Sequence, residues 1–324
     1  MKVRTVNSLM KYLREQHKIS IGGSKDKKNL KNIGYYHGYK GYRYIKNPKN
    51  RITLSSFDEI VSIEDFDTKL KSLLYSQIMK IETISKNCVL QILIEEYKTD
   101  NFNDLYEYGM TDYRNFKNDA EYKDKMRHRI KVQNNIYSSL SKCYNNGNKI
   151  VEHFYSKDRY VPLWGIFEII TLGVFADLIK SLEYDVRLKI AKQMNINKGY
   201  DTNALFPEKM MYLIKALRNS VAHNDIIFDV RFKDNKVSSS LCSFLENEIG
   251  CRNINFNTIT DYVILICFLL KSYGLSKNEI NRFINDYEKI VEDFRNKISI
   301  SIYNQVIYTD NKAKLNYLRN YVKK

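Results

Sequence analysis

Apolar residues recur at three- and four-residue steps along most of the chain. The clearest run spans 56–97, where Phe66, Leu70, Leu74 and Ile78 share one helical face. Residues 98–125 are polar and predict short helices or an irregular insertion. Two short segments, 226–232 and 236–241, predict a small β-hairpin instead. Further helices are expected over 5–17, 126–144, 148–155, 162–182, 184–194, 207–224, 257–273, 276–308 and 311–323.

Only 12 glycines and 3 prolines occur in 324 residues, which together with the helical runs predicts an all-α fold, a helical bundle. A chain of this length can bury one large core or two smaller ones. The apolar stretch 163–179 is interrupted by Glu168 and Asp177, and 262–270 is too short, so neither is expected to cross a membrane. Pro162 is expected to start a helix that Trp164 anchors, with Glu168 on its buried side and Gly173 at a close helix crossing.

Positive charge is concentrated at the two ends of the chain. The net charge is +16 and the isoelectric point is about 9.3. Residues 1–50 carry 13 Lys or Arg against two acidic residues, whereas 51–110 carry 6 basic and 11 acidic residues. An AT-rich genome would explain the overall basicity but not the acidic middle. The distribution therefore predicts a surface that faces a polyanion such as nucleic acid.

The five cysteines form no CxxC pair and lie mostly in apolar stretches, which favours reduced thiols in a cytoplasmic protein. No cysteines and histidines cluster at the spacing of zinc ligands. We therefore expect neither a metal site nor a cofactor. The cysteines are Cys88, Cys143, Cys242, Cys251 and Cys267.

A block at 32–44 interleaves five tyrosines with three glycines, a histidine and two cations. The tyrosines could stack on RNA bases while the cations follow phosphates, or the block could be a tight aromatic core element. We predict two domains: 1–55, a basic RNA-contacting region, and 56–324, a helical domain. The expected RNA contacts are Lys25, Lys27, Lys28, Lys31, Tyr35, Tyr36, His37, Lys40, Tyr42, Arg43, Arg127 and Arg129.

The helix expected over 207–224 carries an unusual polar group at its end. Asn219 and His223 lie about 40° apart on its surface, and Arg218 lies about 140° from His223. An imidazole can exchange a proton with a ribose 2'-hydroxyl or a leaving 5'-oxygen, and a guanidinium can stabilise the charge on the phosphorane oxygens. Asparagine can orient either group. These residues could therefore cleave RNA without a metal.

A single histidine near a helix end is more often structural or solvated than catalytic. The hexad Arg-Asn-x-x-Ala-His at 218–223 is a more specific signal of function than a single histidine. It resembles the signature of the HEPN superfamily, helical domains found in many prokaryotic RNases, and Asn224 also fits that signature. The other four histidines lack an Arg at the same offset.

Four features together resemble the abortive-infection family of AbiD/AbiF type, helical bacterial proteins used against phage. They are the 32–42 block, Phe66-Asp67-Thr68-Lys69-Leu70, Pro162-Leu163-Trp164 with Glu168 and Gly173, and the hexad. They span about 30–225. His37 stands where the family often has arginine.

The resemblance implies a HEPN-like bundle and a metal-independent endoribonuclease toxin, restrained by a structured non-coding RNA. Related CRISPR RNases pair two signatures in one chain. Because this chain has one, a homodimer would be needed to bring two Arg218 and two His223 together. We expect Arg218, Asn219 and His223 to cleave single-stranded RNA and leave a 2',3'-cyclic phosphate.

Two other classes of function stay open. A non-catalytic RNA-binding module would sequester RNA, and cleavage in the presence of a chelator that is lost in Arg218→Ala would separate it from a nuclease. A helical scaffold or antitoxin would instead bind a protein partner in fixed stoichiometry and retain no RNA.

Overall fold

The computed structural model describes residues 5–117, 120–196, 199–233 and 235–324. Their contacts divide the chain into two compact units. The first unit contains the residues up to Gln77 together with 216–271 and 275–324, and the second contains 78–215 and 272–274. Three helices, α3 (Phe57–Tyr97), α10 (Phe206–Ala222) and α12 (Ile259–Ser272), contribute residues to both units. Each unit is described by itself.

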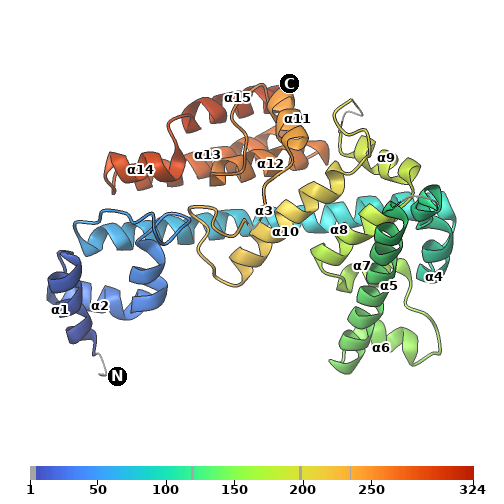
Figure 1. The fold of residues 1–324 in the computed structure, drawn as a ribbon, viewed down its shortest axis with the longest axis horizontal. Helices are drawn as coiled ribbons and strands as arrows, with labels where there is room; N and C mark the ends of the chain where they lie inside the picture. The colour runs from blue at the N-terminus through green and yellow to red at the C-terminus, as the bar shows by residue number, and fades with distance from the viewer. Residues whose placement is uncertain (1–4, 118–119, 197–198, 234) are drawn as a thin grey trace. The chain divides into compact units, whose positions relative to one another are not determined.

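The regular secondary structure of the first unit is helical, with no strand among its described residues (Figure 1). Helix α12 lies at its centre, since every side chain from Ile259 to Leu270 is buried. Helices α11 and α13 pack against α15. Besides its parts of α3, α10 and α12, the unit contains α1 (Val6–His17), α2 (Gly23–Ile33), a π-helical segment η1 (Gly34–Lys40), α11 (Ser239–Ile249), α13 (Lys277–Arg295), α14 (Ile300–Ile307) and α15 (Asn311–Lys323).

Helix α12 also buries a charged side chain, which is paired. Asp261 accepts hydrogen bonds from the backbone N–H groups of Asn255 and Phe256, and its carboxylate lies 2.8 Å from Lys314 Nζ. A buried carboxylate is tolerated only with such partners. The pair therefore links α12 to α15 through the core.

The first part of α3 packs against α13. The rings of Phe66 and Phe294 stack with their centroids 4.2 Å apart. Beside them, Lys69 Nζ lies 2.9 Å from Asp65 and 3.6 Å from Asp293. The apolar stripe predicted for α3 is thus the surface that joins this helix to the C-terminal helices.

In the second unit, α5 is the common packing partner of α6, α7, α8 and η3. Gly173 of α8 lies against the side chain of Lys215 in α10, so that an added Cβ would sit 3.1 Å from Lys215 Cε. The close crossing predicted at Gly173 is confirmed. The elements are α4 (Phe102–Asp104), η2 (Leu105–Gly109), η3 (Asp112–Phe116), α5 (Glu121–Asn145), α6 (Lys149–Tyr155), α7 (Leu163–Ile169), α8 (Leu172–Ser181) and α9 (Tyr184–Gln193).

The predicted β-hairpin is wrong. Residues 226–232 form turns, and most of the expected second strand lies within or beside helix α11. The described residues contain isolated bridges, Ser20 with Ser56 and Tyr44 with Arg51, but no strand. Backbone N–H groups in the turns are bound by side chains, as described below, and are not available for a β-ladder.

Two predicted long helices are each interrupted. The segment 162–182 breaks where Thr171 caps α8 through the N–H of Val174, and 276–308 breaks where Ser299 caps α14 through the N–H of Ile302. Glu168 is exposed, not buried as predicted, and Trp164 is 47% exposed. No helix among the described residues is long and apolar enough to span a membrane.

Candidate functional site

The hexad occupies the last turns of α10. Leu217 and Ser220 point into the protein and are buried, whereas Arg218 and Asn219 are half-buried. His223 follows the last helical residue and is exposed. The predicted end of this helix is therefore confirmed. Its buried residues pack in the core, whereas its half-buried and exposed residues are available for chemistry.

A Schellman motif ends the helix and fixes the backbone of His223. The N–H of Asp225 bonds to the carbonyl of Ser220 at 2.8 Å, and the N–H of Asn224 bonds to that of Val221 at 3.2 Å. Asn224 adopts the left-handed conformation with φ 57°, which asparagine tolerates better than most residues. The backbone position of His223 is thus defined, although its ring faces solvent.

The hexad side chains are only loosely connected to one another. Arg218 Nη1 lies 3.5 Å from Asn219 Oδ1, at the outer limit of a hydrogen bond. The imidazole of His223 has no side-chain partner in the part of the chain that the structure describes. An exposed imidazole one helical turn after Asn219 can meet a ligand from solvent.

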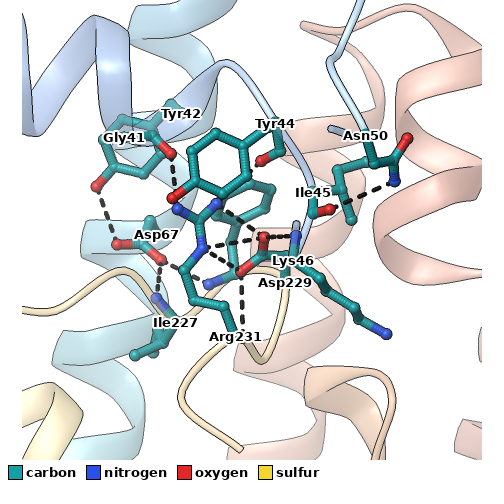
Figure 2. A network of polar contacts seen from close by, with 11 residues as sticks. Gly41, Tyr42, Tyr44, Ile45, Lys46, Asn50, Asp67, Ile227, Asp229 and Arg231 are labelled. Carbon is teal, nitrogen blue, oxygen red and sulfur yellow. Dashed lines mark hydrogen bonds and ion pairs between the residues drawn. The ribbon is translucent and has the colours of Figure 1, made fainter. Parts of the chain in front are cut away.

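Asp67 of α3 binds the segment that follows α10 (Figure 2). Its carboxylate is fully buried. One oxygen accepts the backbone N–H groups of Ile227 at 2.8 Å and Phe228 at 2.7 Å. The other accepts the hydroxyl of Tyr42 at 3.0 Å and lies 2.8 Å from Lys71 Nζ. Four donors thus stabilise a charge that burial alone would make very costly.

The Asp67 network extends to the residue after the candidate catalytic histidine. Lys71 Nζ, besides contacting Asp67, donates to Asn224 Oδ1 at 2.9 Å. Burial and the nearby Asp67 carboxylate raise the pKa of the Tyr42 phenol far above its usual value, so it stays a protonated donor. Three segments that are far apart in the chain therefore meet around one carboxylate: the tyrosine/glycine block, the start of α3 and the residues that directly follow the hexad.

A second ion pair, between buried Asp229 and half-buried Arg231, holds the same loop from the other side. Arg231 donates to the backbone carbonyls of Gly41 and Tyr44, both at 2.9 Å, and its Nη2 lies 2.8 Å from Asp229 (Figure 2). Asp229 also accepts the backbone N–H of Lys46 at 2.5 Å. Sequence reasoning missed this pair. The only local signal is two opposite charges within an apolar segment for which the sequence predicts a strand.

The tyrosine/glycine block is divided between core and surface. Tyr39 and Tyr42 are buried, whereas Tyr36 is 78% exposed. Gly41 lies so close to Ile226 that an added Cβ would overlap the isoleucine side chain. The core interpretation therefore applies to Tyr39, Tyr42 and Gly41, and the surface interpretation stays open for Tyr36.

Most other predicted RNA contacts lie on the surface. Lys25 is exposed and pairs with Asp58 at 3.0 Å. Arg127 and Arg129 belong to the second unit. Arg127 is exposed, but Arg129 donates to the Tyr106 carbonyl at 2.7 Å and stacks on that ring at 3.5 Å. In the first unit Lys27, Lys28, Lys31 and His37 are exposed, and Tyr35, Lys40 and Arg43 are half-buried.

Metal binding has no visible basis among the residues that are described. They contain no group of three or more His, Cys, Asp or Glu side chains able to hold an ion. The five cysteines are all free thiols. The hexad places an imidazole, a guanidinium and an amide in the last turns of α10.

A family model described as Abi-like protein matches residues 28–229, more than half of the chain. The chain belongs to the Abi-like protein family. Family membership supports a role in abortive infection. No curated protein and no solved structure matches the chain. The match contains Asp67, its partners and the hexad, so the network of this Abi-like protein lies within the family region, whereas α11–α15 lie beyond it.

Replacing Asp67 by alanine should destabilise this Abi-like protein by about 3–5 kcal/mol, because it leaves Lys71, Tyr42 and two backbone N–H groups without their buried acceptor. Urea unfolding followed by circular dichroism would measure the loss. Asp65→Ala is the matched control on the same helix, and its partly exposed ion pairs predict a loss of about 1 kcal/mol or less. Equal losses in both variants would contradict the role assigned to Asp67.

Proposed function

We propose that this Abi-like protein is an anti-phage endoribonuclease toxin of HEPN type that acts in the cytoplasm on single-stranded RNA without a metal. Arg218, Asn219 and His223 form its catalytic group. The observation that carries this proposal is the position of His223: its ring faces solvent, while the backbone on both sides is fixed by the helix end and by the Lys71–Asn224 contact.

The proposed reaction is attack of a ribose 2'-hydroxyl on the adjacent phosphorus. The 2'-hydroxyl loses its proton to a base, the bond from phosphorus to the 5'-oxygen breaks, and that oxygen takes up a proton. The products are a 2',3'-cyclic phosphate and a 5'-hydroxyl. His223 transfers protons, Arg218 stabilises the charge on the phosphorane oxygens, and Asn219 orients either partner by hydrogen bonding.

A symmetric dimer would complete the site. The reaction needs a base at the 2'-oxygen and an acid at the 5'-oxygen, and one imidazole cannot serve both at the same moment. Each chain carries one hexad. Two copies related by a twofold axis would supply two imidazoles and two guanidiniums.

A structured non-coding RNA is the proposed regulator. The net charge of +16 and the exposed lysines of α2 favour binding of a polyanion. Such an RNA would hold the toxin until phage infection releases it. This region lies in the same compact unit as the end of α10.

His223→Ala should lower the rate of RNA cleavage at least about 100-fold, since it removes the proton-transfer group. RNA affinity should change little, because the ring is a small part of the basic surface. A gel assay with purified RNA in EDTA would measure cleavage, and fluorescence anisotropy would measure affinity. His153→Ala is a control at another exposed histidine. Retained cleavage in His223→Ala, or loss of folding, would refute the catalytic assignment.

An RNA substrate with a single 2'-deoxyribose at the cleaved position should resist cleavage, because the attacking hydroxyl is absent. The same substitution at a neighbouring position is the control and should leave cleavage at the original site intact. Mass spectrometry of the unmodified products should find the cyclic phosphate. Cleavage at the deoxyribose would exclude the cyclic mechanism.

Dimers that combine one wild-type and one His223→Ala subunit should cleave RNA at least about 100-fold more slowly than wild-type dimers, because they keep a single imidazole and lack either the base or the acid. Two independent sites, each within one subunit, would instead leave such a dimer with about half of the wild-type activity. Cleavage would be measured after co-expression with two different affinity tags and purification through both. Activity near half of the wild-type value would show that the site does not combine residues from two subunits.

A further inference from the structure

A pocket of about 180 Å³ lies in the first unit, in a part of the chain that the proposed catalytic group does not use. Its apolar wall consists of Ile19, Ile52 and Leu54, all of which are buried. Its polar lining comes from three separate segments: His17 at the end of α1, Tyr39 in η1 with Arg43 just after it, and Arg51 and Thr53 in the segment leading to α3.

Backbone hydrogen bonds hold these three segments together. The N–H of Ile52 bonds to the carbonyl of Arg43 at 2.9 Å, and the isolated bridge between Tyr44 and Arg51 is formed beside it. The N–H of Ser20 bonds to the carbonyl of Ser55, also at 2.9 Å. Arg43 and Arg51 are thus placed at the pocket by fixed backbone.

The pocket is strongly positive and lacks a counter-charge. No acidic side chain among the described residues lines it, and neither Arg43 nor Arg51 pairs with a carboxylate there. Two guanidiniums at one pocket repel each other, and this repulsion is relieved when an anion binds between them. An arginine also matches phosphate geometry better than a lysine does, because its planar fork donates two parallel hydrogen bonds.

His17 lies in the positive electrostatic field of these arginines. Its Nε2 is buried and has no hydrogen-bond partner among the described residues, although buried polar atoms are normally paired. Burial lowers the pKa of this imidazole, and Arg43, Arg51 and Lys40 lower it further. The ring is held edge-on to Tyr12 at 5.0 Å and tilted to Tyr39 at 5.2 Å between centroids. His17, which lines the pocket, therefore holds a ring nitrogen without a hydrogen-bond partner.

We propose that this pocket binds the phosphoryl group of an RNA nucleotide, with Arg43 and Arg51 as the charge partners and His17 as a hydrogen-bonding group. The assignment to RNA rests on the proposed function, whereas the assignment to a phosphoryl group rests on the pocket itself. Neither His17 nor Arg51 was among the predicted RNA contacts, because α1 and the segment before α3 meet Arg43 only in the folded chain.

A row of aromatic rings leads from the pocket to an exposed tyrosine and favours a nucleotide over a bare anion. Tyr39 contacts Tyr35 at 5.6 Å between centroids, and Tyr35 contacts Tyr36 at 5.4 Å. Tyr36 is 78% exposed, and Lys40 Nζ lies 5.7 Å from its ring. A base can stack on an exposed tyrosine while the phosphate of the same strand is bound nearby.

The test uses the full chain with His223→Ala, so that binding is measured without cleavage. An RNA oligonucleotide labelled at its 3' end would be titrated by fluorescence anisotropy, once with a 5'-phosphate and once with a 5'-hydroxyl. Arg51→Gln should weaken binding of the RNA about tenfold or more, since it removes a charged hydrogen-bond donor. Arg282→Gln is the matched control, an exposed arginine of α13 outside the pocket, and should have little effect.

Two further measurements identify the bound group. Inorganic phosphate should compete with the RNA more strongly than chloride at equal ionic strength, and Arg51→Gln should abolish that difference. A preference for the 5'-phosphorylated RNA would assign the pocket to a strand end, and equal affinity would assign it to an internal phosphate. Tyr36→Leu should weaken RNA binding but leave competition by phosphate unchanged.

Equal losses of RNA affinity in Arg51→Gln and Arg282→Gln would overturn the assignment of the pocket to a phosphoryl group. The absence of specific competition by phosphate would do the same. Competition by phosphate with no effect of Tyr36→Leu would overturn the nucleotide assignment and leave a site for a free anion. Because all of these are binding measurements on a His223→Ala chain, failure of the proposed nuclease activity would not affect them. If the pocket proves not to bind a phosphoryl group, the cleavage assays likewise remain interpretable.

Discussion

The buried carboxylate of Asp67 is the constraint on which the first unit depends. A charge at full burial is tolerated only when its oxygens are satisfied, and here two backbone N–H groups, a phenol and an ammonium do so. These donors come from the tyrosine/glycine block, from α3 and from the loop after α10. Removing any one of these segments leaves the others with unpaired polar groups, so the three fold together. The Asp229–Arg231 pair repeats this arrangement on the other side of the loop.

The residues that stabilise the end of α10 are different from the residue proposed to transfer protons. The groups that fix the end of α10 are buried or paired, whereas His223, at the very end of the helix, is exposed. A site on rigid elements holds its reactive groups better than one on a free loop. The half-buried Arg218 and Asn219 are carried by the helix itself, and His223 is anchored through its neighbour Asn224. The proposed dimer would use this exposed end.

The N-terminal segment has both a structural and a surface role. Tyr42 and Gly41 complete the core around the end of α10, so the segment is part of the same compact unit. Its other face carries Tyr36, exposed lysines and the pocket of Arg43 and Arg51. RNA bound to this face would therefore contact the elements that also position the end of α10. This gives the proposed RNA regulator a physical connection to the proposed nuclease.

The sequence alone determined the all-α class, the long helix α3, the end of α10 and the hexad, because helical periodicity and capping act within a few residues. Family membership followed from residues 28–229. Tertiary structure decided what local patterns cannot contain: the partners of Asp67, the role of Arg231 and the pocket around Arg51. It also replaced the predicted hairpin with turns, because Asp67, 160 residues away along the chain, binds the N–H group that a strand at Ile227 would need. Contacts of that separation exist only once the chain has folded.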